Sequence, residues 1–385
     1  MRILHIDTER GWRGGERQVL WLAEELGRQG HDSIIVARPG QPLALKAMQA
    51  GLDVVYCAPR FEADPFAVLR LRQLVSRARI AIIHAHTAHA AGLGALATVG
   101  SKIPLVVARR VDFHLRRNPG TRWKYGRAAA IIAISRAVAR ILESDGIPPS
   151  RVTVVPDGTD VNRQIAPAAG ETLESLGVTP GAPLVVQVAQ LVSHKDPLNF
   201  VRAVAAARSR VPNLQALLVG DGPLRGDVVE AVRALGLGET LHLAGYRQDA
   251  DALLAAADVA VLSSREEGMG SVLLDALVLG KPIAATRAGG IPEVVDHDRT
   301  GLLAPVGEPV QLGEAMAMLL TDRTLAMRLA AAAKAHAADF SLERLAARTL
   351  AVYERVLDRG AGGMETERRA VSASHSSSRS SMRAP

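Results

Sequence analysis

The sequence predicts an α/β protein made of two doubly wound domains that face a central cleft. Its 385 residues are too many for one ordinary hydrophobic core, which favours two domains. The composition is 48% hydrophobic but only 3% aromatic, so the cores consist mainly of Ala, Val, Leu and Ile, as suits helices packed on parallel sheets. Short apolar runs rich in β-branched residues alternate with helical stretches, which is the pattern of such sheets.

The first domain, expected over residues 1–165, opens with the strand RILHID and a glycine loop. The loop holds Gly11, Gly14 and Gly15, and a helix that ends at Gly30 follows it. A second strand, HDSIIVAR, completes a βαβ crossover of the kind that builds parallel, Rossmann-like sheets. Five more strands are expected at LDVVYCA, AIIHAH, LVVARR, AIIAIS and VTVVPDG. The glycines do not form a dinucleotide fingerprint, so the loop either binds a ligand or is a tight turn without one.

The second domain, expected over residues 166–340, has the same architecture without a sequence repeat. Its strands are expected at APLVVQVAQ, LQALLVGDG, TLHLAGY, DVAVLSS and PIAAT, and RAGGIPEVV supplies another glycine loop. Residues 341–359 are expected to form a helix that packs back on the first domain. Residues 360–385 are rich in Ser and Arg with little to bury, so a disordered tail is expected there.

One stretch of the second domain, residues 263–282 (SSREEGMGSVLLDALVLGKP), predicts a ligand site. A buried strand precedes it, Gly268 and Gly270 form a loop, and apolar residues then recur at helical spacing. A strand–loop–helix unit presents free backbone N–H groups and the positive end of a helix dipole, which favour an anionic ligand. Glu267 lies in the loop, and Asp275 lies two turns into the helix.

Charge and cysteine content limit the class of protein. The net charge is +7, but no RNA-binding, zinc-finger or zipper pattern is present, so anionic substrates are expected rather than nucleic acid. The single cysteine, Cys57, cannot form an internal disulfide, which fits a reducing cytoplasm. No apolar run reaches the roughly 18 residues of a transmembrane helix, and MRILHID is typical of a strand rather than a signal peptide, so a soluble protein is expected.

The motifs of the second half resemble those of the retaining glycosyltransferases of family 4, which have the GT-B fold. That family carries Glu-Gly-Phe-Gly after a strand that ends in Ser, and a second Glu on the following helix. Here the loop is EGMG (267–270), and Asp275 stands at the position of the second Glu. GDGPLR, GYR, GGIPEVV and GLLAPVGEP also follow the family's order, and GGERQVLWLAEELGRQGHD resembles its first loop and helix.

The resemblance covers the chain from Met1 to about Leu357 and implies an activity. It implies transfer of a sugar from a nucleoside diphosphate to an acceptor hydroxyl, with retention at the anomeric carbon. The C-terminal half would bind the donor, and the N-terminal half would bind a saccharide or lipid-linked acceptor. A role in the synthesis of cell-envelope polysaccharide or lipopolysaccharide fits the family, in the cytoplasm or peripherally at the inner face of the membrane.

The resemblance also implies residues that bind the donor. Asp275 would accept hydrogen bonds from the ribose hydroxyls, although its side chain is one methylene shorter than that of Glu. Glu267 would lie near the donor sugar, and Lys195 would neutralise the diphosphate, where negative charge develops during transfer. The diphosphate would be held by the backbone N–H groups of Gly268, Met269, Gly270 and Ser271.

Three further positions would complete the donor site. Gln190 stands where the family usually has an arginine, so it can donate a hydrogen bond but brings no charge. We hypothesise that Arg265 or Arg247 supplies this charge. Gly14 and Gly15 would let the first loop approach the donor phosphate and the acceptor.

On the acceptor side, the candidates are Arg110, Asp112 and His114. The family often has a histidine after the strand IPLVVAR, and Arg110 aligns with it. Arg110 would bind a phosphate or an acidic acceptor, but it is a poor general base because a guanidinium stays protonated. No protein nucleophile is required, because enzymes of this family pass the acceptor proton to the donor phosphate in a front-face substitution. His114 is either an acceptor-side residue or an imidazole in a surface loop.

No metal site and no cofactor are expected beyond the nucleotide-sugar substrate. Asp157 and Asp160 lie close in sequence, but VVPDGTD resembles the family's turn at the domain junction, which favours structural or cleft-lining carboxylates. His84 and His86 are expected to face opposite sides of their strand, which argues against a shared metal.

The sequence leaves two points open. The basic stretch 109–127 is either a solvated loop and helix or a face for an anionic acceptor or an acidic membrane. Two other classes of protein also stay open: an epimerase or phosphorylase with the GT-B fold, and a non-catalytic protein that binds nucleotide sugars.

Overall fold

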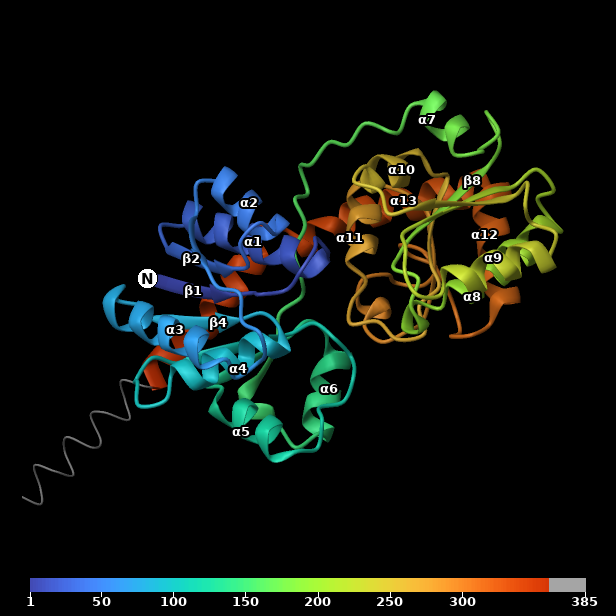
Figure 1. The fold of residues 1–385 in the computed structure, drawn as a ribbon. Coiled ribbons are helices and arrows are strands. Elements are labelled where there is room, and N and C mark those ends of the chain that lie inside the picture. Colours follow the sequence, from blue (N-terminus) through green and yellow to red (C-terminus); the bar gives the residue numbers. More distant parts are fainter. Residues whose placement is uncertain (360–385) are drawn as a thin grey trace, which may run out of the picture.

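The protein forms two α/β lobes that meet where α1 and α11 face each other (Figure 1). The structure is a computed structural model that describes residues 1–359, so the tail expected at residues 360–385 lies outside the described residues. Each lobe contains one parallel sheet with helices packed against it. The predicted fold class, two doubly wound domains of the GT-B type, is confirmed.

The first sheet has seven parallel strands in the order β3-β2-β1-β4-β5-β6-β7. The strands are β1 (Arg2–Ile6), β2 (Asp32–Ala37), β3 (Asp53–Tyr56), β4 (Ile82–Ala85), β5 (Leu105–Arg109), β6 (Ala130–Ala133) and β7 (Val152–Val154). The helices are α1 (Gly14–Arg28), α2 (Pro42–Gln49), α3 (Pro65–Arg77), α4 (Ala88–Ala97), α5 (Pro119–Arg127) and α6 (Arg136–Ser144), and the short turn η1 (Pro149–Arg151) precedes β7. All seven strands lie where the sequence predicted them. The strand order reverses between β1 and β4, and ligands of doubly wound sheets bind at such a switch point.

The second sheet has six parallel strands in the order β10-β9-β8-β11-β12-β13. The strands are β8 (Leu184–Val188), β9 (Gln215–Val219), β10 (Leu241–Gly245), β11 (Val259–Leu262), β12 (Ile283–Thr286) and β13 (Leu302–Ala304). The helices are α7 (Gly170–Ser175), α8 (Pro197–Arg208), α9 (Arg225–Ala234), α10 (Ala250–Ala256), α11 (Ser271–Val278), α12 (Pro309–Thr321) and α13 (Arg323–His336). Short turns occur at η2 (Ser193–Lys195), η3 (Ile291–Glu293) and η4 (Ala337–Phe340). The sequence did not predict β13, because three residues are too few to show a strand pattern. The switch point here lies between β8 and β11.

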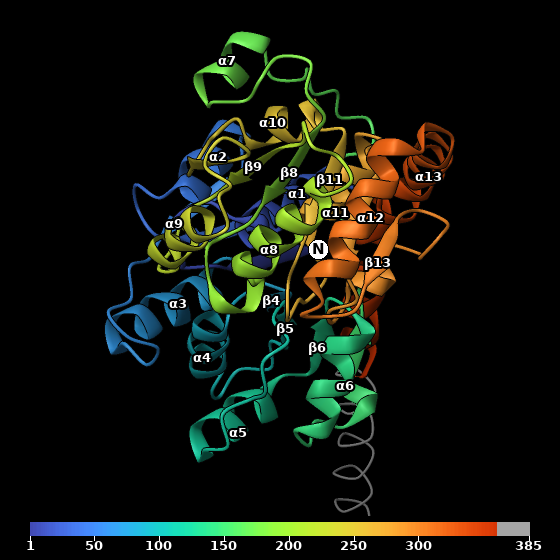
Figure 2. The same ribbon diagram turned by 90° about the vertical axis from the view of Figure 1, so that its right-hand side faces the viewer.

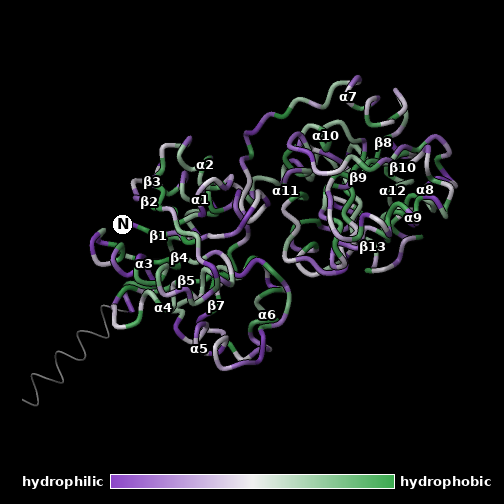
Figure 3. The backbone as a smooth tube through the Cα atoms, viewed as in Figure 1, coloured by the Kyte–Doolittle hydropathy of each residue, from purple (hydrophilic) through white to green (hydrophobic). Residues whose placement is uncertain are grey.

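Apolar residues fill the strands of both lobes, and polar residues lie mainly in the loops (Figure 3). All four residues of β4, β6, β11 and β12 are buried. Strands covered on both faces must be apolar almost throughout, which explains the continuous runs in the sequence. Figure 2 looks onto the second lobe, where α8 and α12 lie side by side in front of the sheet.

The chain returns to the first lobe after η4. The N–H of Thr159 donates to the carbonyl of Phe340 at 2.7 Å, so the outgoing and returning segments lie together. Residues 342–359 form a helix whose Leu345 and Tyr353 belong to the same apolar cluster as Ile3 and Leu22 of the first lobe. Among the helices of residues 1–359, none has both the length and the apolar character needed to cross a membrane.

Candidate functional site

Two neighbouring loops of the second lobe bring Lys195 and Glu267 together. Lys195 ends η2, after β8, and Glu267 follows β11, which pairs directly with β8. The Lys195 ammonium forms an ion pair with Oε2 of Glu267, and the Ser264 hydroxyl donates to the same oxygen at 3.1 Å. Glu267 is buried and Lys195 is half-buried. The pair therefore places one ammonium group, fixed in position, at the switch point of the second sheet.

The loop after Glu267 supplies hydrogen-bond donors beside this ammonium. Gly270 has φ +85°, a left-handed conformation that favours glycine, and α11 begins at the next residue, Ser271. Within residues 1–359, none of the backbone N–H groups from Gly268 to Ser271 donates a hydrogen bond to another protein group. Free N–H groups at a helix N-terminus next to a lysine form a suitable seat for a phosphate.

The first lobe closes over this loop at two glycines. A Cβ on Gly14, at the start of α1, would lie 2.5 Å from Oγ of Ser271. A Cβ on Gly268 would lie 2.3 Å from the backbone oxygen of Arg110. A Cβ on Gly15 would have no atom within 4 Å. Side chains at Gly14 and Gly268 would therefore keep the lobes apart, whereas Gly15 is not under this constraint.

Asp275 on α11 links the lobes through two arginines that the sequence did not reveal. Arg17 of α1 donates to its Oδ2 at 2.7 Å, and Arg163 of the connecting segment donates to its Oδ1 at 2.9 Å. Arg163 also pairs with Asp251 at 2.9 Å. Burial raises the pKa of Asp275, and the two guanidinium groups counter that rise. Both carboxylate oxygens thus already accept hydrogen bonds in this closed arrangement.

A third contact between the lobes caps helix α6. The carboxylate of Glu293, in η3, accepts the backbone N–H of Arg136 at 2.9 Å and that of Ala137 at 3.0 Å. These two residues begin α6, so an anion from one lobe satisfies free donors at the N-terminus of a helix in the other. No local sequence signal links positions so far apart.

Neither arginine proposed to replace the charge missing at Gln190 is free. Gln190 itself is exposed. Arg265 pairs with Asp196 at 2.9 Å, and Arg247 pairs with Asp249 at 2.7 Å. An arginine neutralised by an aspartate offers little charge to a phosphate, so the hypothesis that Arg265 or Arg247 compensates is not favoured.

The acceptor-side candidates separate into two groups. Arg110 is held by Asp157, which accepts from its Nε at 3.1 Å, and its backbone lies against Gly268. Asp112 is half-buried, and burial, together with the nearby Glu267, raises its pKa. His114 instead bonds Asp145 at 2.8 Å and is exposed. The structure thus brings Arg110 and Asp112 to the site and ties His114 to the end of α6.

The expectation that His84 and His86 face opposite sides is wrong. Residues two apart on a strand point to the same face, and the two ring centroids are 4.0 Å apart. His5 of the neighbouring β1 joins them, and one ring nitrogen of each of the three buried side chains lies within 4.8 Å of the others. This geometry would allow a metal ion. The hydrogen bonds of the three rings distinguish a metal site from a chain of neutral histidines.

The hydrogen bonds favour a neutral chain over a metal site. Arg110 donates to Nδ1 of His86 at 3.2 Å, which leaves the proton of His86 on Nε2. That proton is donated to Nδ1 of His5 at 3.0 Å, and Nε2 of His5 reaches Ser33 at 3.3 Å. Burial lowers the pKa of His5 to about 3, consistent with a neutral ring. A cation here would break this chain beside a guanidinium group, so we interpret the cluster as a support that orients Arg110.

The two facing Rossmann-like lobes define a protein of the GT-B fold class. Both halves of the chain match models of glycosyltransferase families. Residues 12–163 match the model described as Glycosyltransferase Family 4, and residues 171–336 match Glycosyl transferases group 1. The chain therefore belongs with the family-4 glycosyltransferases, as its motifs indicated.

Solved structures show the same fold. HepE of Anabaena, in complex with UDP and glucose, has a TM-score of 0.80 and 22% identity, over 92% of this chain and 100% of that one. Sucrose-phosphate synthase of Thermosynechococcus elongatus has a TM-score of 0.76 and 20% identity, over 93% and 99% of the two chains.

Curated relatives are similar over part of their length. The 2-deoxystreptamine glucosyltransferase of Streptomyces kanamyceticus is 31% identical over 61% of this chain and 63% of its own. The D-inositol 3-phosphate glycosyltransferase of Nocardia farcinica is 31% identical over 73% of this chain and 62% of its own. The chain thus matches less than two thirds of each of these relatives.

Proposed function

We propose that the protein is a retaining glycosyltransferase that moves a sugar from a nucleoside diphosphate to an acceptor hydroxyl. The observation that carries this proposal is the Lys195–Glu267 pair beside the free N–H groups of residues 268–271, at the switch point of the second sheet. The second lobe binds the donor. The first lobe binds the acceptor, because Gly14 and Arg110 approach the same loop from that side.

Each residue of the seat has a role toward the donor. The N–H groups of residues 268–271 hold the diphosphate, and the Lys195 ammonium neutralises it. Glu267 holds Lys195 in place and accepts hydrogen bonds from the hydroxyls of the sugar. Asp275 accepts hydrogen bonds from the ribose hydroxyls. These hydroxyls either bind the Asp275 carboxylate together with Arg17 and Arg163 or displace the two arginines from it.

Transfer proceeds on one face of the sugar. The acceptor oxygen bonds to the anomeric carbon as the bond from that carbon to the diphosphate oxygen breaks. The acceptor proton passes to the departing phosphate oxygen, so no protein base or nucleophile is required, and the anomeric configuration is retained. Lys195 and the amide N–H groups stabilise the charge that develops on the diphosphate, which lets the reaction proceed without a metal.

The names of the relatives cover acceptors of opposite charge. Two are named for 2-deoxystreptamine, others for D-inositol 3-phosphate and L-malate, and one for the lipopolysaccharide core. We propose a saccharide or polyol acceptor in the synthesis of cell-envelope material, in the cytoplasm.

Turnover assays separate this proposal from its two alternatives. With UDP-, GDP- and ADP-sugars, a transferase releases nucleoside diphosphate only when an acceptor is present. An epimerase of the same fold changes the sugar without an acceptor, and a non-catalytic protein binds a donor without releasing product. Lys195→Ala and Glu267→Ala should each lower transfer by about 10²-fold or more, and the site assignment is wrong if both variants keep wild-type turnover.

We also propose that the region around α5 contacts an acidic membrane surface. Four cations of the basic stretch are used internally. Arg109 donates to the carbonyl of Phe113, and Arg110 pairs with Asp157. Lys124 pairs with Glu62, and Arg127 donates to the carbonyl of Thr98 at 3.0 Å. Exposed cations and aromatic rings remain at Phe113, Arg116, Arg117, Arg122 and Trp123. Basic and aromatic side chains together suit an anionic interface.

Vesicle sedimentation tests this contact. The protein should cosediment with vesicles of phosphatidylglycerol at low salt. Added salt should release the protein, because salt screens the attraction between exposed charges. Replacing Arg116 and Arg117 by Gln should weaken sedimentation. Absence of binding at low salt would refute the contact.

A further inference from the structure

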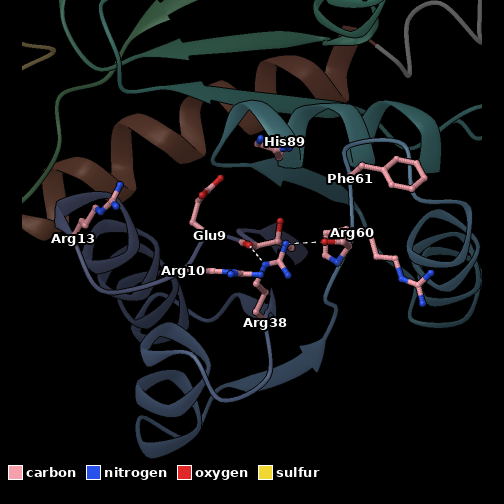
Figure 4. Close-up of a pocket in the computed structure, with 9 residues that line it drawn as sticks. Glu9, Arg10, Arg13, Arg38, Arg60, Phe61 and His89 are labelled. Atoms are coloured by element: carbon pink, nitrogen blue, oxygen red, sulfur yellow. Dashed lines mark hydrogen bonds between the residues drawn. The ribbon is translucent and has the colours of Figure 1, made fainter. Parts of the chain in front are cut away.

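A pocket of about 270 Å³ lies in the first lobe at the carboxyl ends of its strands (Figure 4). The loops after β1, β2 and β3 and the first turn of α4 form its wall. The charged and titratable residues of the lining are Glu9, Arg10, Arg13, Arg38, Arg60 and His89. The pocket therefore adjoins the β1–β4 switch point, where doubly wound sheets bind ligands.

The lining carries an excess of positive charge. The lining contains four arginines and one carboxylate, Glu9, which leaves three positive charges in excess, the histidine not counted. Arg10, Arg13 and Arg60 are exposed, and no carboxylate within residues 1–359 forms an ion pair with any of them. This differs from Arg17 and Arg163, which are paired with Asp275. Unpaired arginines on several loops of one pocket are suited to an anion.

Arg38 is fixed in the wall of the pocket without being neutralised. Its Nε donates to the carbonyl of Thr8 at 2.6 Å, and its Nη2 donates to the carbonyl of Pro59 at 2.7 Å (Figure 4). These carbonyls hold the guanidinium but carry no net charge, and no carboxylate of the described residues pairs with it. The third nitrogen of the Arg38 guanidinium, Nη1, can donate hydrogen bonds to a ligand. A guanidinium already held in place loses little conformational entropy when it binds a phosphate.

We infer that this pocket binds a phosphate monoester on the acceptor, which makes the substrate a phosphorylated polyol or sugar. The inference rests on the proposed glycosyltransferase function. The arginines bind the phosphate, and Glu9 accepts hydrogen bonds from hydroxyl groups of the same molecule. Arg13 directly precedes Gly14, which contacts Ser271 of the proposed donor loop (residues 267–271), so this wall of the pocket adjoins the contact between the lobes. The same arginines repel an acceptor that carries amino groups.

Calorimetric titration with sn-glycerol 3-phosphate tests the inference. The full chain is first saturated with UDP, so that the donor diphosphate seat is filled. Wild type should bind sn-glycerol 3-phosphate and not glycerol. Arg10→Gln and Arg60→Gln should each weaken binding by about tenfold, because each removes a charge-assisted hydrogen bond, and Arg60→Glu should abolish it. Arg233→Gln, an exposed arginine on α9 in the other lobe, is the matched control and should bind as wild type does.

Two results would overturn the inference. One is equal binding by wild type, Arg10→Gln and Arg60→Gln, with melting temperatures that show all three are folded. The other is loss of sn-glycerol 3-phosphate binding when UDP is added, which would assign the arginines to the donor diphosphate. Vesicles containing phosphatidic acid distinguish the source of the phosphate. Arginine-dependent binding to vesicles but not to sn-glycerol 3-phosphate would overturn a soluble acceptor in favour of a lipid headgroup.

A transfer assay separates this inference from the proposed function. If no nucleotide sugar is turned over with any acceptor, but sn-glycerol 3-phosphate still binds and depends on Arg10 and Arg60, the proposed function fails and the anion pocket stands. If transfer occurs equally well to phosphorylated and unphosphorylated acceptors, the proposed function stands and the phosphate subsite fails.

Discussion

At the residue scale, the proposed chemistry depends most on Lys195. Its ammonium is held by an ion pair with Glu267, the residue that directly precedes the free N–H groups of residues 268–271. Lys195→Ala should lower kcat by about 10²- to 10³-fold, because it removes a group that stabilises charge in the transition state. Steady-state kinetics would measure this, with Arg233→Gln as the control for loss of a surface charge. A loss confined to KM would indicate a role in ground-state binding only.

Gly14 and Gly15 provide a matched pair of substitutions. Gly14→Ala places a methyl group 2.5 Å from Oγ and 3.2 Å from Cβ of Ser271, whereas Gly15→Ala meets no atom within 4 Å. We expect Gly14→Ala to lower kcat/KM by about tenfold or more, because closure positions the reacting groups, and Gly15→Ala to have little effect. Ser271→Gly in the Gly14→Ala background should restore part of the activity. Equal kinetics for the two alanine variants would show that this contact does not matter.

At the scale of elements, the cap on α6 predicts an effect on lobe closure. Glu293 accepts two backbone N–H groups of α6 from across the cleft. Glu293→Ala should destabilise the closed form by about 1–2 kcal/mol, the range expected for such hydrogen bonds to a charged group. Small-angle scattering should then give a larger radius of gyration without ligand. Glu230→Ala, an exposed glutamate on α9, is the control, and identical radii for the two variants would refute the capping role.

The histidines at the ends of β1 and β4 predict a loss of stability in acid. Burial lowers the pKa of His5 to about 3 and lowers those of His84 and His86 well below the usual value of about 6.5. The unfolded chain therefore binds more protons than the folded chain below pH ~6.5, so stability falls as the pH falls. Burial raises the pKa of Asp7 to about 7, which acts in the opposite direction between pH ~4 and 7.

The three histidines each contribute destabilisation in acid, and the raised pKa values of Asp7, Asp112, Asp157 and Asp275 offset part of that contribution. Each proton taken up on unfolding changes the stability by about 1.4 kcal/mol per pH unit. Denaturant unfolding between pH 5 and 7 should show this slope, and Asp7→Asn should steepen it because the opposing group is removed. A slope that Asp7→Asn leaves unchanged would contradict a raised pKa of Asp7 in the folded protein.

Elements and local motifs could be predicted well from the sequence, but contacts between distant segments could not. Continuous apolar runs identified twelve of the thirteen strands, because strands buried on both faces leave that pattern. EGMG and Lys195 follow adjacent strands, so motif order was enough to bring them together. The pairing of Arg17 with Asp275 joins positions 258 residues apart, and no local pattern encodes it. The faces of His84 and His86 could have been predicted, since residues two apart on a strand share a face.

At the scale of the whole molecule, the structure is a closed form held by contacts on three segments. These are the glycine contacts at the donor loop, the clamp of Arg17 and Arg163 on Asp275, and the cap on α6. The proposed donor seat lies in the second lobe and the arginine pocket in the first, so closure would bring the two proposed ligands together. Because Asp275 already bonds both arginines, its shorter side chain serves lobe closure as well as the proposed ribose contact.

The central claim is that the diphosphate of the donor lies between Lys195 and the N–H groups of residues 268–271. A crystal structure with bound UDP measures this most directly. We predict a β-phosphate oxygen within hydrogen-bonding distance, about 3 Å, of the Lys195 ammonium and of at least one of these N–H groups. A diphosphate bound in the arginine pocket of the first lobe, with Lys195 still paired only to Glu267, would contradict the claim.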